Sequence, residues 1–389
     1  MSLAFIDLQA QRRRIADKID AAVRRTIEGG AYIMGPDVIE FERQMSAFAG
    51  AKRTLSCANG TDALVLPLMA WGVADGDAVF CPSFTFAATA EIIPWTGASP
   101  VFVDILPDTY NMDPDHLEAS IQQVIKSGKL KPKAIIAVDL FGQPADYPRI
   151  SAIAKKYNLK LIADSAQGFG CTINGKHPVE WADCVTTSFF PAKPLGCYGD
   201  GGAVQTNDGE LADLIDSLRV HGKATKADIE REKFEHDPKY MNVRIGLNSR
   251  LDTIQAAILI EKLAIFADEI DKRNAVAKRY NDGLKGYVEA TPAMIQGGVS
   301  TWAQYTIEVG ERDGLAAHLK RENVPTAVYY PIPIHKQKIY SVYPTGPGGL
   351  PVSEAKADKV ISLPMHPYLE PAIQDQIIDK IRAFNGGKA

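Results

Sequence analysis

Between about residue 52 and residue 205, short apolar runs alternate with stretches of mixed polarity. Four of these runs are nearly continuous in apolar residues, a pattern typical of strands buried on both faces of a parallel sheet. They are DAVFCP at 77–82, SPVFVDI at 99–105, KAIIAVDL at 133–140 and LKLIAD at 159–164. The regular spacing of these runs predicts a sheet that is covered on both sides.

Helical spacing of apolar residues appears between the runs. One helix is predicted to begin after Asp113, with Pro114 at its first position. Its apolar face is expected to consist of Leu117, Ile121, Val124 and Ile125. The same spacing upstream predicts a helix face made of Val38, Phe41, Met45 and Phe48. Alternating strands and helices of this kind predict a layered α/β domain.

The carboxyl-terminal third of the chain has a different pattern. Residues 252–284 are predicted to form one long helix that links two lobes. The runs TWAQYTIEV at 301–309 and VPTAVYYPIPI at 324–334, with a closing helical pattern, predict a smaller α+β lobe. The segment YPTGPGGLP at 343–351 is expected to be a surface loop. We therefore expect a large domain at 1–251, with its amino-terminal helix packing on the small domain, and a linker helix with the small domain at 252–389.

Composition narrows the class of protein. A chain of 389 residues exceeds one ordinary domain, which agrees with two lobes. The net charge of -4 offers no large basic surface, so we expect no nucleic-acid partner. No apolar run approaches the ~20 residues of a membrane helix, and the amino terminus lacks an apolar secretory signal. We therefore expect a cytoplasmic protein that is not bound to a membrane.

The cysteines show no metal-ligand spacing such as CxxC, and no HExxH motif is present, so we expect no metal site. Most lie in apolar, strand-like surroundings, which predicts buried thiols in a reducing compartment. Cys197, in a glycine-rich loop, stays open as a reactive thiol.

Two predicted strand ends carry candidate ligand-binding residues. Asp164 ends the run LKLIAD, and ligands of open α/β sheets bind beyond the carboxyl ends of strands. The same carboxylate is equally suited to cap a following helix. In SCANGTDAL at 56–64, the chain passes through Asn59 and Gly60 into a helix predicted to begin near Thr61, which would cap it. The N–H groups of a first helical turn attract phosphate.

Lys193 lies in FFPAKPLGCYGDGGAV at 189–204, an apolar stretch followed by glycines. It is either part of an exposed turn between buried strands or an amine held in a pocket. The chain contains neither GxxxxGK[ST] nor GxGxxG, which removes most support for a nucleotide-binding explanation. Pyridoxal phosphate needs a lysine for a Schiff base, an acid beside its ring nitrogen and N–H donors for its phosphate. Lys193, Asp164 and the turn at Gly60 and Thr61 together favour pyridoxal 5'-phosphate as the cofactor.

A series of motifs extends over nearly the whole length of the chain. They are FIDLQAQ, GPDVIEFE, CANGTDAL, PSFTFAATAE, ADSAQGFG, SFFPAKPLGCYGDGGA, RVHG, GLNSRLDTIQAAIL, YYPIPIHKQ and SLPMHPYL. In these motifs and in their order, the chain resembles the DegT/StrS-type nucleotide-sugar aminotransferases. The resemblance implies a fold-type I pyridoxal-phosphate-dependent transferase. Such a protein has a large domain, with a mixed, mostly parallel sheet between helices, and a smaller α+β carboxyl-terminal domain.

The resemblance also implies roles for single residues. Lys193 would form the Schiff base with the cofactor and then move a proton between the substrate carbon and the cofactor, for which burial must lower its pKa. Asp164 would pair with the ring nitrogen, Gln167 would bond the ring hydroxyl, and Phe86 would stack on the ring. From its residue type alone, Phe86 could equally be core packing.

Phosphate and partner contacts are implied in the same way. Gly60, Thr61 and Ser188 would hold the phosphate. Asn248 would reach the phosphate of a neighbouring subunit's cofactor, which makes a homodimer with shared active sites necessary. Ser188 could otherwise end a strand, and Asn248 could be an ordinary turn residue.

The substrate is the least determined part of the prediction. The resemblance implies transfer of an amino group from glutamate to a nucleotide-linked keto sugar, and its motifs look most like those of the branch that aminates UDP-2-acetamido-2-deoxy-3-oxo-D-glucuronate for surface polysaccharide such as O-antigen. Arg250 could pair with the uronate, while Tyr329, Tyr330 and His335 are candidate sugar contacts. Because histidine is expected at the position of Tyr329, a 4-keto-6-deoxy hexose stays open. Lys193 counts against the related dehydratase chemistry, and a pyridoxal-phosphate-binding sensor without turnover stays a third alternative.

Overall fold

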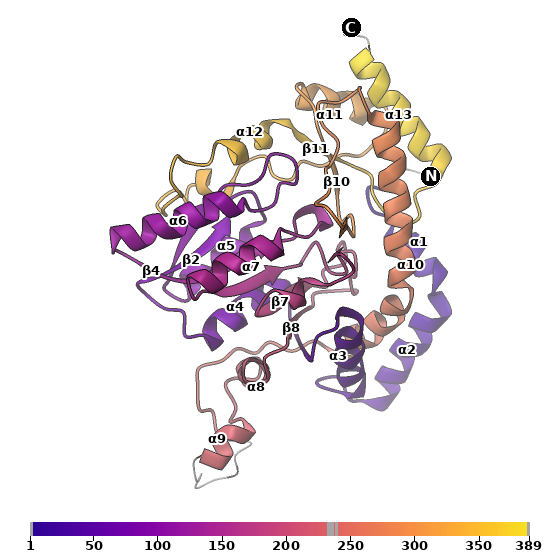
Figure 1. The fold of residues 1–389 in the computed structure, drawn as a ribbon. Helices are drawn as coiled ribbons and strands as arrows, with labels where there is room; N and C mark the ends of the chain where they lie inside the picture. The colour runs from indigo at the N-terminus through magenta and orange to yellow at the C-terminus, as the bar shows by residue number, and fades with distance from the viewer. Residues whose placement is uncertain (1–2, 232–236, 238–239, 387–389) are drawn as a thin grey trace.

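A seven-stranded sheet forms the centre of the computed structural model, which describes residues 3–231, 237 and 240–386 (Figure 1). Its strand order is β1-β8-β7-β5-β4-β2-β3, and β8 alone runs antiparallel to its neighbours. The strands are β1 (Arg53–Cys57), β2 (Asp77–Pro82), β3 (Ser99–Val103), β4 (Lys131–Val138), β5 (Lys160–Asp164), β7 (Cys184–Ser188) and β8 (Gly202–Thr206). The four apolar runs of the sequence are β2 to β5, which confirms the mixed, mostly parallel sheet.

Helices cover both faces of this sheet, which explains why the runs that form β2 to β5 are nearly continuous in apolar residues. On one face pack α4 (Gly60–Ala70), α5 (Ala87–Trp95) and α8 (Gly209–Leu218); on the other pack α6 (Pro114–Ser127) and α7 (Tyr147–Lys156). Along β2, Val79 and Cys81 face the first layer, whereas Ala78 and Phe80 face the second. The predicted face of α6 is wrong at one position, because Ile125 is exposed while its other three residues are buried.

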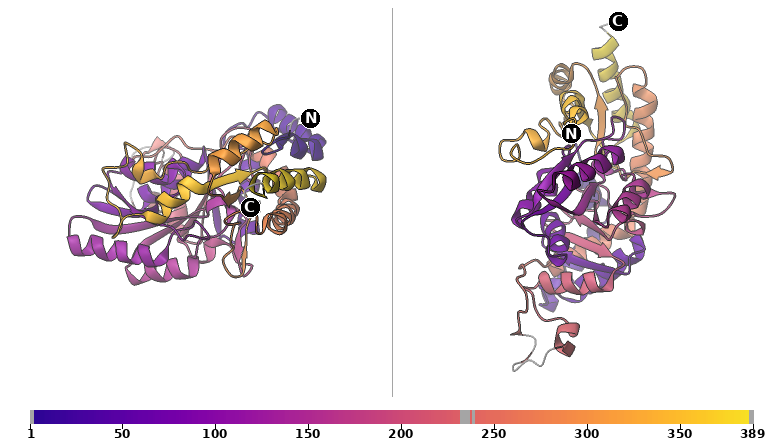
Figure 2. Two further views of the ribbon diagram at one scale, coloured as in Figure 1. Left: turned by 90° about the horizontal axis from the view of Figure 1, so that it is seen from above. Right: turned by 60° about the vertical axis from the view of Figure 1, so that its left-hand side comes forward.

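The predicted long helix is α10 (Thr253–Leu284), and Asp252 is its N-cap residue. Three other helices pack along it: α2 (Ala16–Gly29), α3 (Pro36–Ala49) and α13 (Pro371–Gly386). In α1 (Leu8–Arg14), the Gln11 amide donates to the buried Glu269 carboxylate of α10 at 2.9 Å. The helices α1 and α2 therefore lie against α10, whereas α3 packs against both α10 and β1 (Figures 1 and 2).

Beyond α10 the chain builds a smaller layer around the antiparallel pair β10 (Tyr305–Glu308) and β11 (Val360–Leu363). It includes α11 (Arg312–Arg321) and α12 (Pro351–Lys359). The remaining elements are β6 (Thr172–Ile173), β9 (Gly298–Val299), α9 (Lys226–Arg231) and 3-10 turns at Leu140–Gly142, Pro178–Glu180 and Ile334–Lys336. The division into domains 1–251 and 252–389 stays a prediction.

The loop at 343–351 is more firmly attached than its composition suggests. The Phe102 N–H of β3 donates to the Pro344 carbonyl at 3.0 Å, and the Gly346 N–H donates to the Phe102 carbonyl at 2.9 Å. The loop thereby covers the open edge of the central sheet, which would otherwise present unpaired backbone groups.

All five cysteines are buried, with free thiols. None of the described helices has the length and apolar character needed to cross a membrane. Within the described residues, no group of three or more His, Cys, Asp or Glu side chains is arranged to hold a metal ion.

Candidate active site

The parallel strands end at one edge of the sheet, and the segments that follow them carry most of the predicted site residues. Gly60 follows β1, Phe86 follows β2, Gln167 follows β5 and Lys193 follows β7. Asp164 is the last residue of β5. Residues that are far apart in the sequence therefore meet at this edge, as the topology of open α/β sheets requires.

Lys193 extends from a tight turn. Its N–H donates to the Phe190 carbonyl at 2.9 Å. A Cβ atom on Gly196 would lie 2.6 Å from the carbonyl oxygens of Phe190 and Pro191, so the return of the chain requires glycine. Burial lowers the pKa of the Lys193 amine, and the negative charge of Asp164 acts in the opposite direction. The two groups are thus close enough for their charges to interact.

Asp164 is 3% exposed and is held by hydrogen bonds. One carboxylate oxygen accepts from the Thr89 hydroxyl at 2.8 Å, and the other accepts from the Ala166 N–H at 3.2 Å. Burial raises the pKa of Asp164, while these hydrogen bonds and the charge of Lys193 lower it. Residues 166–170 form a turn, so Asp164 does not cap a helix.

Gln167 has a fixed amide orientation. Its carbonyl oxygen accepts from the Phe141 N–H at 2.8 Å, and its NH₂ group donates to the Tyr330 hydroxyl at 3.0 Å. Phe141 has φ 60°, a left-handed conformation that is uncommon for a residue with a side chain. The Tyr330 ring lies 6.4 Å from that of Phe86, which is 57% exposed. Gln167, Tyr330 and Phe86 therefore line one side of the site.

The first turn of α4 faces Ser188, the last residue of β7. A Cβ atom on Gly60 would lie 2.6 Å from the Ser188 Cβ, so glycine permits this close approach. The predicted cap is wrong: α4 begins at Gly60, and Asn59 caps it by accepting from the Asp62 N–H at 2.8 Å. Thr61 is instead the second residue of the helix. The N–H groups of Gly60 and Thr61 have no carbonyl partner inside the helix, so they are available to an anion.

The other predicted residues lie at the borders of this site. Ser249 accepts from the Ala58 N–H at 3.2 Å, which places the neighbouring residues Asn248 and Arg250 beside the β1–α4 connection. Asn248 is exposed and Arg250 is half-buried. Tyr329 lies near Phe5, with 6.5 Å between the ring centroids.

His335 differs from the other candidates because both of its ring nitrogens have protein partners. One nitrogen lies 2.6 Å from the Ser83 hydroxyl, and the other lies 3.0 Å from a Glu354 carboxylate oxygen. These contacts join the segment after β2 to α12. Any sugar contact by this ring has to compete with them.

Sequence reasoning missed three residues of the site: Thr89, Phe141 and Asp139. Thr89 had a usable signal, because it follows Thr85 by four residues, shortly after the predicted strand at 77–82, and the two hydroxyls lie 3.0 Å apart. Phe141 and Asp139 act through contacts with the turn after β5. Their roles depend on strand order and leave no local pattern.

The residues fit pyridoxal phosphate. The backbone approach at Gly60 leaves unpaired N–H groups for a phosphate, and Lys193 supplies an amine, whose pKa is lowered by burial, near the carboxylate of Asp164. The Gln167 amide and the Phe86 ring are suited to a ring hydroxyl and a ring face. Each chemical group of the cofactor thus has a matching side chain or backbone group.

Comparison with known proteins identifies the family. Residues 13–382 match the model of the DegT/DnrJ/EryC1/StrS aminotransferase family. The chain belongs to this family. It is 48% identical to a UDP-2-acetamido-2-deoxy-3-oxo-D-glucuronate aminotransferase from Pseudomonas aeruginosa, over 95% of this chain and 97% of the relative.

Two solved structures support the assignment. A DegT/DnrJ/EryC1/StrS aminotransferase from Brucella abortus has a TM-score of 0.94 at 52% identity, covering 99% of this chain and all of that one. The protein ntda from Bacillus subtilis, crystallised with its cofactor PMP, has a TM-score of 0.85 at 28% identity, covering 99% of this chain and 85% of that one. This chain is therefore a fold-type I aminotransferase that uses pyridoxal phosphate, which confirms the predicted family, fold and cofactor.

Proposed function

We propose that this aminotransferase aminates the 3-oxo group of UDP-2-acetamido-2-deoxy-3-oxo-D-glucuronate with glutamate as the donor. The observation that carries the reaction type is the convergence of Lys193, Asp164 and Gln167 at one edge of the sheet. The Pseudomonas aeruginosa relative, at 48% identity, supports this choice of sugar. We place the reaction in the cytoplasm, as a step toward surface polysaccharide such as O-antigen.

Lys193 has the central catalytic role in this proposal. The bound cofactor supplies an electron sink and carries the amino group between the two substrates. The Lys193 amine removes the proton from the α-carbon of glutamate and later donates a proton to C3 of the sugar. Burial favours its neutral form, which the first of these steps needs. Asp164 keeps the ring nitrogen protonated, and Gln167 donates to the ring hydroxyl.

The uronate carboxylate needs a cation, and Arg250 is the proposed partner. Within the described residues, no carboxylate pairs with the Arg250 guanidinium. A planar guanidinium binds a carboxylate with two parallel hydrogen bonds. Tyr329 and Tyr330 are the proposed contacts of the sugar ring, with His335 at its border.

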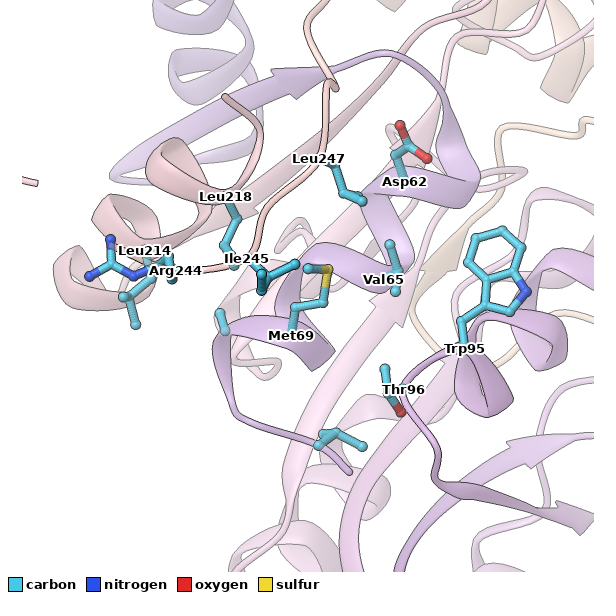
Figure 3. A pocket seen from close by; sticks show the side chains of 12 residues that line it. Asp62, Val65, Met69, Trp95, Thr96, Leu214, Leu218, Arg244, Ile245 and Leu247 are labelled. Atoms are coloured by element: carbon cyan, nitrogen blue, oxygen red, sulfur yellow. The ribbon is translucent and has the colours of Figure 1, made fainter. Parts of the chain in front are cut away.

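The active sites are proposed to be shared in a homodimer. Arg244, Ile245 and Leu247 border an apolar pocket of about 550 Å³ formed with α4, α5 and α8, where Val65, Met69 and Leu247 face one space (Figure 3). At its rim, Ile245 is 87% exposed and Trp95 is 61% exposed. A second copy of the chain would cover these side chains. Asn248 and Arg250, which follow Ile245 in the same segment, would then enter the active site of that second copy.

Single-turnover amination tests the proposed substrate. Protein loaded with glutamate is mixed with the 3-oxo uronate, with the same 3-oxo sugar lacking the carboxylate, or with a 4-keto-6-deoxy nucleotide sugar. We expect the uronate to react best. We expect Arg250→Met to raise the uronate concentration needed for a half-maximal rate at least about tenfold, while the reaction of the uncharged 3-oxo sugar stays unchanged. Preferential amination of the 4-keto sugar would replace the substrate assignment. No turnover with any sugar, despite a glutamate half-reaction, would refute it.

A further inference from the structure

Asp139 is a fully buried carboxylate directly after β4, beside the strand that carries Asp164. Its N–H donates to the Asp164 carbonyl at 3.0 Å. Among the residues that the structure describes, no Lys or Arg side chain pairs with it. A buried carboxylate without a cation is costly unless hydrogen bonds satisfy it. The contacts of its two oxygens therefore indicate what it holds in place.

The two oxygens of Asp139 bind different parts of the chain. One accepts from the Tyr147 hydroxyl at 2.7 Å and from the Ala145 N–H at 3.0 Å, which are both in its own connection. The other accepts from the Ser165 hydroxyl, in the turn after β5. The carboxylate thus joins the β4–α7 connection to the turn that follows Asp164.

That turn is packed tightly against Asp139. A Cβ atom on Gly168 would lie 2.3 Å from the Asp139 Cβ, so only glycine permits the approach. Ser165 immediately follows Asp164 and comes two residues before Gln167. Two residues after Asp139, the Phe141 N–H holds the Gln167 amide. Both proposed ring contacts are therefore fixed by the same pair of connections.

We propose that Asp139 is a positioning residue, which acts through Ser165 to set the placement of Asp164 and Gln167 against the cofactor ring. This inference rests on the ring contacts proposed above, but it does not depend on which sugar is aminated. It assigns the hydrogen bond between Asp139 and Ser165 to ring recognition and leaves phosphate recognition to the first turn of α4.

Binding of pyridoxamine phosphate to the cofactor-free, full-length protein tests this role. This ligand makes no covalent bond to Lys193, so its affinity reports the ring and phosphate contacts together, whereas the affinity of inorganic phosphate reports only the phosphate contacts. We expect Asp139→Asn and Ser165→Ala each to weaken pyridoxamine phosphate about tenfold, while phosphate affinity stays unchanged. The double variant should be no weaker than either single variant, because each substitution removes the hydrogen bond from the Ser165 hydroxyl to a charged carboxylate.

Asp104→Asn is the matched control. Asp104 is also a buried carboxylate at a strand end, but it binds the Val352 and Ser353 N–H groups at 2.9 and 2.8 Å, at the start of α12. The Asp104→Asn substitution should lower the melting temperature without changing the ratio of the affinities for pyridoxamine phosphate and inorganic phosphate. Equal weakening of both ligands by Asp139→Asn, or fully additive effects in the double variant, would overturn the inference.

A reference variant separates this inference from the proposed ring contacts. Asp164→Asn should weaken pyridoxamine phosphate directly. If it does not, the ring contact itself is wrong; if it does and Asp139→Asn does not, only the positioning role is wrong. If the Asp139→Asn protein does not fold, the Ser165→Ala variant alone tests the positioning role, because it leaves the buried carboxylate in place.

Discussion

At the scale of single residues, the site depends on how Lys193 and Asp164 modify each other. Burial disfavours the charged form of each, so it lowers the pKa of Lys193 and raises the pKa of Asp164. Their mutual attraction opposes both shifts. The cofactor aldehyde reacts with a neutral amine, so the lowered pKa of Lys193 favours that reaction. The charge of Lys193 favours the charged form of the Asp164 carboxylate, which is the form that pairs with a protonated ring nitrogen.

Capture of the cofactor is predicted to depend on pH through Lys193. A lowered pKa means that the neutral amine dominates above an inflection that lies under the usual value of 10.5. When cofactor-free protein is mixed with pyridoxal phosphate, a visible absorption band should appear. The rate of its appearance should increase with pH and become constant before the pH reaches 10.5. An inflection at or above 10.5 would mean that burial does not control this amine. Lys193→Ala should show no such band.

Thr89 is predicted to support Asp164 chemically. Its hydroxyl donates to the carboxylate at 2.8 Å and lowers the pKa of Asp164. Thr89→Val keeps the shape but removes the donor, so the pKa of Asp164 should rise and the glutamate half-reaction should slow about tenfold. Thr89→Ser retains the hydroxyl and should stay near the wild-type rate. Equal rates for the valine and serine variants would assign Thr89 to packing alone.

At the scale of elements, the start of α4 is the proposed binding site of the cofactor phosphate. Asn59 caps the helix, while Gly60 lets its first turn approach Ser188. The same position in α8 is Gly209, where an added Cβ would meet nothing within 4 Å. The two glycines that begin these helices thus differ in their surroundings, so replacing each of them by alanine should have different effects.

Gly60→Ala is predicted to weaken phosphate binding. The new methyl group would lie 2.6 Å from the Ser188 Cβ, so the helix start must move away from β7. Affinity for inorganic phosphate and for pyridoxamine phosphate should both fall, by at least about tenfold. Gly209→Ala should leave both affinities unchanged and stabilise the protein by up to about 1 kcal/mol, measured by denaturant unfolding. Unchanged phosphate affinity in Gly60→Ala would remove this turn from the phosphate site.

Elements with a strong local pattern could be predicted from the sequence. The run at 77–82 is β2 along its whole length, and α10 begins one residue after the predicted start. The cap of α4 was misassigned because asparagine and threonine both cap helices well, and the start of the helix decides between them. Asp139 and Phe141 were missed because their partners, Ser165 and Gln167, lie in the turn that follows another strand. The sequence pattern could place strand ends, but not the contacts between the connections that follow them.

At the scale of the whole molecule, the segment that contains α9 extends away from the central sheet (Figures 1 and 2). Further along the chain, Arg244, Ile245 and Leu247 border the pocket of Figure 3. Asn248 and Arg250 follow them in the same segment. An extended segment that brings polar side chains to an exposed apolar rim is suited to a contact between two copies. In a two-fold symmetric dimer, this segment of each subunit would contact the active site of the other subunit.

Shared active sites predict that two inactive variants restore each other. Lys193→Ala lacks the reactive amine, whereas the double variant Asn248→Ala/Arg250→Ala lacks the groups that the partner would receive. In a mixed dimer, one site has both defects and the other has neither. After unfolding and refolding together in equal amounts, random pairing makes about half of the dimers mixed, so activity should recover to about one quarter of the wild-type value. Mixing without subunit exchange should recover nothing. If these side chains served their own subunit, every site would keep one defect, and refolding together would not restore activity.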